Sequence, residues 1–82
     1  MATGGYGVSR IKICNDSPIL NKNIKEADLP KSNILILAVE RDGNITPNPS
    51  PDTQVMLGDS LICFGKFIDI RRKVCLEPQD NV

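Results

Sequence analysis

The feature that most constrains this 82-residue chain is a run of six apolar residues at 34–39, Ile-Leu-Ile-Leu-Ala-Val. Apolar side chains at every position predict a strand that is covered on both faces, or covered on one face by a partner subunit. A chain this short buries only about 60% of the surface that its unfolded form exposes, so its core is thin. The run therefore predicts one small domain that pairs with a second copy as a homodimer.

Further strands and two short helices are predicted around this run. Residues 8–14 alternate between apolar and polar types, as in a half-buried strand. Asn23 and Glu26 form a capping box for a helix over residues 24–28, and Pro30 prevents the helix from continuing. The other expected elements are a strand at 44–46, a brief strand or single turn at 54–57, a buried strand at 60–64 and an amphipathic helix from residue 67 to a stop at 77–78.

The order of these elements is β–α–β–β–(β)–β–α. Asp42 and Gly43 supply the positive φ angles that a two-residue hairpin turn requires. Strands that follow one another through tight turns pair antiparallel, so we predict an α+β fold with a small, mainly antiparallel or mixed sheet and two short helices. The domain is expected at residues 8–76, between a flexible, Gly-rich leader at 1–7 and a frayed tail at 77–82.

Charge and composition exclude several classes of function. Ten Lys and Arg balance ten Asp and Glu, which argues against a nucleic-acid partner. The longest apolar run is too short to span a membrane, so no membrane insertion is expected. The chain has no histidine to activate a nucleophile, and we therefore expect no enzyme activity and no catalytic residues.

The three cysteines, Cys14, Cys63 and Cys75, include no CxxC pair. We expect all three to be reduced thiols that pack as small hydrophobes in a cytoplasmic protein. Cys63 lies inside an apolar strand, where burial raises the pKa of a thiol and keeps it inert.

The aspartates give no strong metal signal. They lie at turns and helix ends, where carboxylates usually cap backbone amides, and we therefore predict no metal site and no cofactor. A calcium site assembled from scattered turn carboxylates and carbonyls is the open alternative, because its ligands need no fixed spacing.

Several blocks of sequence, in the correct order, resemble the TrkA C-terminal (RCK-C) domain family. The blocks are residues 17–30, 34–41, 42–53 and 57–65. The most telling parts are Asn-Pro-Ser-Pro-Asp-Thr at 48–53 and a Gly-Asp turn at 58–59 that leads to an apolar strand ending in glycine. The resemblance spans roughly residues 8–74.

The resemblance also assigns roles at two turns. Family members usually carry glycine where this chain has Asn21, and asparagine is the residue next best able to adopt a left-handed conformation, so we expect a positive φ at Asn21. Gly58 is expected to supply the permissive backbone of a tight reversal that Asp59 caps.

The resemblance implies a cytoplasmic regulatory domain of a potassium or other monovalent-cation channel or transporter. Such domains dimerise, and in the parent system they adjoin a Rossmann-type lobe or a membrane channel. Small ligands near the dimer cleft, such as cyclic di-AMP or divalent cations, shift the gating equilibrium. The alternative is a passive dimerisation domain of another transport-related or soluble protein, with no ligand of its own.

Cyclic di-AMP is not the expected ligand. Family members that bind it resemble one another in an Asp, an Arg two positions later and an Asn six positions after that. Asp28 matches the first position, but Pro30 and Ile36 stand at the other two, which removes the bidentate phosphate donor. The candidate residues for a different ligand are Asp28, Lys31, Asn33 and Arg41.

Overall fold

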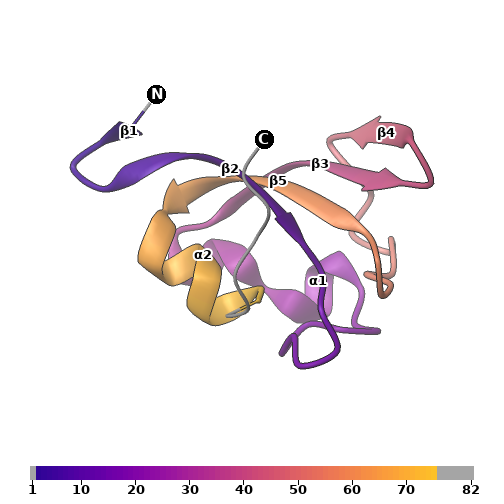
Figure 1. Ribbon diagram of the computed structural model, residues 1–82. Helices are drawn as coiled ribbons and strands as arrows, with labels where there is room; N and C mark the ends of the chain where they lie inside the picture. The colour runs from indigo at the N-terminus through magenta and orange to yellow at the C-terminus, as the bar shows by residue number, and fades with distance from the viewer. Residues whose placement is uncertain (1, 76–82) are drawn as a thin grey trace.

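The computed structural model describes residues 2–75, which form a five-stranded antiparallel sheet with helices on one of its faces (Figure 1). The elements are β1 (Ala2–Thr3), β2 (Tyr6–Lys12), α1 (Ile24–Ala27), the 3₁₀ helix η1 (Leu29–Ser32), β3 (Leu35–Arg41), β4 (Asn44–Pro47), β5 (Ser60–Lys66) and α2 (Phe67–Lys73). The strand order is β1-β2-β5-β3-β4, so the last strand in sequence lies in the middle. The predicted α+β class, the two short helices and the antiparallel sheet are confirmed.

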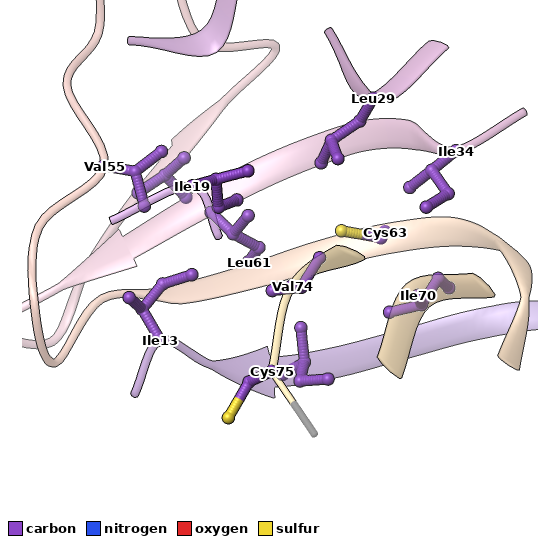
Figure 2. Packing of buried hydrophobic residues seen from close by; sticks show 12 residues of the cluster. Ile13, Ile19, Leu29, Ile34, Val55, Leu61, Cys63, Ile70, Val74 and Cys75 are labelled. Atoms are coloured by element: carbon purple, nitrogen blue, oxygen red, sulfur yellow. The ribbon is translucent and has the colours of Figure 1, made fainter. Parts of the chain in front are cut away.

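The core lies between the sheet and α2, η1 and the loops that surround them. Leu61 and Cys63 of β5 are fully buried, and Ile70 and Val74 pack over the same side of the sheet (Figure 2). Ile70 of α2 and Val74, the residue that caps the end of α2, are buried as the amphipathic pattern predicts, whereas Phe67 at the start of the helix is exposed.

The apolar run at 34–39 is covered on one face only. A register shift between Ile36 and Ala38 breaks the strict alternation of β3. Ile36 and Val39 pack toward the core, whereas Leu35 and Leu37 remain exposed on the single chain. Of the two alternatives for this strand, coverage of both faces by its own chain is therefore wrong, and coverage by a partner stays a prediction.

The predicted caps and turns are present. The Asn23 side chain accepts a hydrogen bond from the Glu26 N–H (2.7 Å), and the Glu26 carboxylate accepts one from the Asn23 N–H (2.9 Å). Asp42 and Gly43 both have positive φ, 51° and 79°, at the turn between β3 and β4. The expected positive φ at Asn21 is confirmed at 66°.

Several boundaries differ from the predicted ones. Residues 2–7, expected as a leader, form β1, a turn and the start of β2, because positive φ angles at Gly4 and Gly5 let the chain reverse and pair with itself. Of the two alternatives for residues 54–57, the strand is absent, since Gln54 makes only a single bridge to Asn23, and a turn closed by the Asp59 N–H and the Met56 carbonyl (3.0 Å) follows. The predicted helix stop and the tail at 77–82 lie outside the described residues.

Cys14 and Cys75 form a disulfide, and the expectation that they are reduced thiols is wrong. Their Cα atoms lie 6.0 Å apart although 61 positions separate them in sequence. They meet because α2 returns across the sheet and ends beside the residues that follow β2. The bond links the last described residue of the chain to the loop after β2.

Cys63 is a free, buried thiol, and burial raises its pKa to about 12. At pH 8 roughly one thiol in ten thousand is then ionised, compared with about a quarter for an exposed cysteine. We expect iodoacetamide to modify the native, non-reduced protein at least 100-fold more slowly than the urea-unfolded protein, with a single thiol labelled after unfolding. Mass spectrometry of timed samples checks this, and equal rates in the two states would contradict the burial of Cys63.

Within residues 2–75, no helix has the length and apolar character needed to cross a membrane.

Candidate functional site

Three of the four candidate ligand residues lie together, on the connection between α1 and β3. Asp28 ends α1 with left-handed backbone angles (φ 47°), and Asn33 ends η1 in the same conformation (φ 60°). Leu29 is buried between them and anchors the connection to the core, while Asp28, Lys31 and Asn33 are exposed. The connection therefore presents a carboxylate, an amine and an amide to solvent from a segment with two tight backbone reversals.

A glycine in the neighbouring strand holds the end of this connection close to the sheet. A Cβ atom added to Gly65 of β5 would lie 3.1 Å from the Asn33 carbonyl oxygen and 3.3 Å from the Ile34 side chain. Only glycine allows this approach without displacing the backbone at Asn33. The strand continues one residue past Gly65, so this glycine serves close packing rather than strand termination.

The proline-rich segment lies against the first turn of α1, which precedes this connection. The Ile24 N–H donates to the Thr53 carbonyl (2.9 Å), and the Lys25 N–H donates to the Pro51 carbonyl (3.0 Å). These bonds satisfy amide donors in the first turn of α1 that have no partner inside a helix. The Asn-Pro-Ser-Pro-Asp-Thr block thus lies beside α1 and accepts hydrogen bonds from its first turn through two backbone carbonyls.

Arg41 does not join the other three candidate residues. It ends β3, and the seven residues of that strand separate it from Asn33 by about 20 Å at the usual rise per residue. Its guanidinium donates to both carboxylate oxygens of Asp59 (2.8 Å each) and to the Gln54 carbonyl (2.8 Å). The structure therefore assigns Arg41 a structural contact, because β3 carries it away from the connection.

Asp59 caps its turn as predicted and is the acceptor for this arginine. Its side chain is 1% exposed, and it also accepts a hydrogen bond from the Met56 N–H (2.9 Å). Burial by itself would raise the pKa of Asp59, but the hydrogen bonds from Arg41 and Met56 and the charge of Arg41 outweigh burial and lower it. Gly58, with φ 89°, allows the reversal that brings Asp59 into place.

The lowered pKa of Asp59 predicts a loss of stability in acid. Above the ordinary aspartate pKa of about 3.9, the carboxylate is ionised in both the folded and the unfolded state, and its stabilising contribution is complete. As the pH falls below that value the unfolded state binds a proton first, and the contribution disappears as the pH passes through the lower folded pKa. Urea midpoints between pH 5 and pH 2 should fall more steeply for the wild type than for Asp59→Asn, and parallel curves would contradict this.

The two positions that depart from the cyclic di-AMP pattern offer no phosphate donor. Pro30 is exposed at the start of η1 and has no N–H, and Ile36 packs partly against the core. No group of three or more His, Cys, Asp or Glu side chains lies close enough in residues 2–75 to hold a metal ion.

Sequence reasoning did not find the disulfide or the Arg41–Asp59 contact. An odd number of cysteines left the pairing undetermined, and nothing in the spacing favours Cys14 with Cys75 over Cys63 with either. The Arg41–Asp59 contact depends on β5 lying beside β3, and no spacing in the sequence indicates that order.

Comparison with known proteins agrees with the fold. Residues 8–72 match the TrkA-C domain family. Among solved structures, the RCK C domain of the potassium transport protein KtrA in complex with cyclic di-AMP is 24% identical with a TM-score of 0.69, over 82% of this chain and 78% of that one. The RCK_C domain dimer of Streptococcus agalactiae BusR, also in complex with cyclic di-AMP, is 25% identical with a TM-score of 0.68, over 85% of this chain and 86% of that one.

One curated relative is named as an enzyme and not as a transport protein. It is a probable alpha-L-glutamate ligase of Rhodopirellula baltica, 34% identical over 70 residues. The match covers 85% of this chain but spans only 17% of that relative's length.

Proposed function

The chain belongs to the TrkA-C domain family, and from that membership we propose that it is a regulatory domain of a potassium or other monovalent-cation transport system. In this proposal it acts as a homodimer on the cytoplasmic side of the membrane, senses a small ligand and catalyses no reaction itself. In the parent system a Rossmann-type lobe or a membrane channel adjoins it.

The match over residues 8–72 carries the proposal, and two structures support its details. KtrA is a potassium transport protein whose RCK C domain binds a cyclic dinucleotide, and the BusR domain that binds the same nucleotide is a dimer. Each of these two structural matches covers at least four fifths of this chain.

We place the ligand at the connection between α1 and β3, on Asp28, Lys31 and Asn33. These three side chains are exposed on one anchored segment, whereas Arg41 is held by Asp59. Lys31 could contact an anionic group, and the Asn33 amide could donate or accept a hydrogen bond. Because Pro30 and Ile36 replace the arginine and asparagine, the proposed ligand is not cyclic di-AMP.

The proposed mechanism is a population shift between two geometries of the dimer. A ligand that contacts one geometry better than the other moves the equilibrium by the difference between its two affinities. Binding of the ligand should therefore increase the thermal stability of the isolated domain.

Thermal-shift measurements test this proposal. At a ligand concentration of 100 times Kd, binding stabilises the folded state by about 2.7 kcal/mol, which is a large change for a domain of this size. The panel contains cyclic di-AMP, other cyclic dinucleotides, mononucleotides, Ca²⁺ and K⁺. We expect at least one of these compounds to raise the melting temperature of the wild type. The double variant Lys31→Ala, Asn33→Ala should lose this rise, and the control variant Lys73→Ala should retain it. A rise with cyclic di-AMP alone would overturn the ligand assignment.

A second candidate function is a passive structural domain carried by another protein. The Rhodopirellula baltica relative favours it, since a region similar to this chain makes up a small part of a probable ligase rather than of a transporter. Flat melting curves across the whole panel, together with a stable dimer, would favour this second function over a ligand sensor.

A further inference from the structure

The Cys14–Cys75 disulfide joins two parts of the fold that are held in place very differently. Cys14 follows the sheet directly: the Ile13 N–H donates to the Asp59 carbonyl (2.7 Å), and every residue of β2 pairs with β5. Cys75 lies just beyond α2, which packs on one face of the sheet (Figure 1). The bond therefore ties the end of a helix to the part of the chain that strand pairing holds most firmly.

α2 has few other attachments to the sheet. It has seven residues, fewer than the roughly 12–15 that an isolated helix needs in water, and no side chain caps its first turn. Ile70 is the one residue within α2 that is buried, and Val74 and Cys75 are buried just after its end. The Phe67 N–H also donates to the Gly5 carbonyl (3.1 Å). Opening the disulfide should therefore allow α2 to detach locally while the strands stay paired.

Cys63 lies beneath this helix. Ile70 and Val74 belong to the same buried cluster as Cys63, on the helix side of β5 (Figure 2). The residue of β2 that pairs with Cys63 is Ser9, whose side chain is small and covers little of its neighbour. Detachment of α2 would therefore give reagents access to a thiol that is fully buried in the oxidised chain.

The two residues that form the disulfide differ in exposure. Cys75 is 1% exposed, whereas Cys14 is half-buried at the start of the loop after β2. Thiol–disulfide exchange begins when a thiolate attacks one sulfur of the bond and displaces the other as a thiolate. A small thiol in solution therefore reaches the Cys14 sulfur, and Cys75 is the leaving group.

We propose that the Cys14–Cys75 bond is a reversible redox switch, which a low-molecular-weight thiol such as glutathione opens by attack at Cys14, and that opening releases α2 and uncovers Cys63. The inference rests on the cytoplasmic placement in the proposed function, because disulfides in that compartment are mostly transient, catalytic or redox-sensing.

The exchange takes two steps. In the first, a glutathione thiolate forms a mixed disulfide with Cys14, and the displaced Cys75 thiolate takes up a proton. In the second, another glutathione thiolate attacks the glutathione sulfur of the mixed disulfide and displaces the Cys14 thiolate, which is also protonated. Two electrons pass to the protein, and the products are two protein thiols and one oxidised glutathione. The reverse reaction with oxidised glutathione closes the bond again.

Hydrogen exchange of the wild-type chain in its oxidised and reduced forms tests the release of α2. The Val74 N–H donates to the Ile70 carbonyl (2.9 Å), so its exchange reports the last turn of the helix. We compare its exchange rate with that of amides at the centre of β5, each relative to the unfolded chain. Reduction should raise this ratio at least about 30-fold, because α2 opens without the sheet. An unchanged ratio would show that the bond only stabilises the whole domain, and would overturn the switch.

Labelling of Cys63 by iodoacetamide tests whether α2 covers this thiol. A thiol reached by local opening reacts at a rate that changes less than about twofold between 0 and about 1 M urea, whereas one reached by global unfolding reacts at least about fivefold faster. We expect the weak dependence for the double variant Cys14→Ala, Cys75→Ala. The control Asp59→Ala keeps the disulfide but loses the contact with Arg41, and it should show the steep one. A steep dependence in the double variant would contradict the release of α2.

Peptide mapping tests the site of attack. The three cysteines fall in separate tryptic peptides, at residues 13–22, 42–66 and 74–82. The oxidised wild type is incubated in a glutathione buffer poised as in the cytosol and quenched in acid at timed intervals. The glutathione adduct should be at least about tenfold more abundant on Cys14 than on Cys75. Equal adducts on both would overturn Cys14 as the site of attack, and a bond that remains closed in this buffer would overturn the switch.

The outcomes separate this inference from the proposed function. An exchange ratio that does not respond to reduction would overturn the switch and leave a ligand-sensing domain intact. Selective release of α2, together with flat melting curves across the whole ligand panel, would overturn the ligand-sensing function and leave the switch.

Discussion

Replacing Cys14 and Cys75 together with alanine is expected to lower the free energy of unfolding by about 4 kcal/mol, because their disulfide closes a loop with a sequence separation of 61. A loop of this length restricts the unfolded chain strongly. A domain of 82 residues has a total stability of only about 4–12 kcal/mol, so the variant would lie near the limit of folding. The corresponding fall in melting temperature is on the order of 20 °C.

The reducing agent TCEP provides the matched control. It should lower the melting temperature of the wild type toward that of the double variant and leave the variant unchanged. Cys63→Ala removes a buried thiol that is not part of the disulfide. TCEP should lower the melting temperature of this variant as it does that of the wild type. A wild type whose melting temperature does not respond to TCEP, with three labelled thiols after unfolding without reductant, would contradict the bond.

Asp59→Ala is expected to destabilise the domain by about 2–3 kcal/mol. The substitution removes two hydrogen bonds from Arg41 and one from the Met56 N–H, and bonds to a charged group contribute about 1.5–3 kcal/mol. The Arg41 side chain is 47% exposed and can be hydrated when its partner is lost, so the effect stays below the 3–5 kcal/mol typical of a fully buried ion pair. Chemical denaturation at pH 7 measures the difference.

Two further variants isolate the contact. Asp52→Ala removes an exposed aspartate from the loop at 51–52 and should change the stability by no more than about 0.5 kcal/mol. Arg41→Lys keeps the charge but cannot present two parallel N–H donors to the Asp59 carboxylate, and an intermediate loss is expected. Equal stability of Asp59→Ala and Asp52→Ala would show that the Arg41–Asp59 contact contributes nothing measurable.

Local chemistry predicted the local structure of this chain well. The capping box at Asn23 and Glu26, the hairpin turn at Asp42 and Gly43, and the left-handed Asn21 each depend on neighbouring residues alone, and each is present. Strand and helix types followed from apolar periodicity for the same reason. The 3₁₀ helix at residues 29–32 is not among the predicted elements, because Pro30 prevents α1 from continuing but also suits the first turn of a new helix.

Features set by long-range contacts could not be predicted in the same way. The strand order that places β5 between β2 and β3 brings Arg41 to Asp59 and separates it from Lys31, and no local pattern encodes that order. The pairing of Cys14 with Cys75 depends on where α2 ends relative to β2. Candidate site residues chosen by closeness in sequence therefore lie together where one short connection holds them, and lie apart across the length of β3.

The covalent link between residues 14 and 75 also determines how the domain would respond to mechanical load. Tension applied between the two ends of the chain would pass through the sulfur atoms and bypass the 60 residues between them. An extended residue spans at most about 3.3–3.6 Å, so these residues could otherwise extend to about 200 Å, and the disulfide prevents this extension. In the oxidised form, extension under load would therefore be confined to the residues before Cys14 and after Cys75.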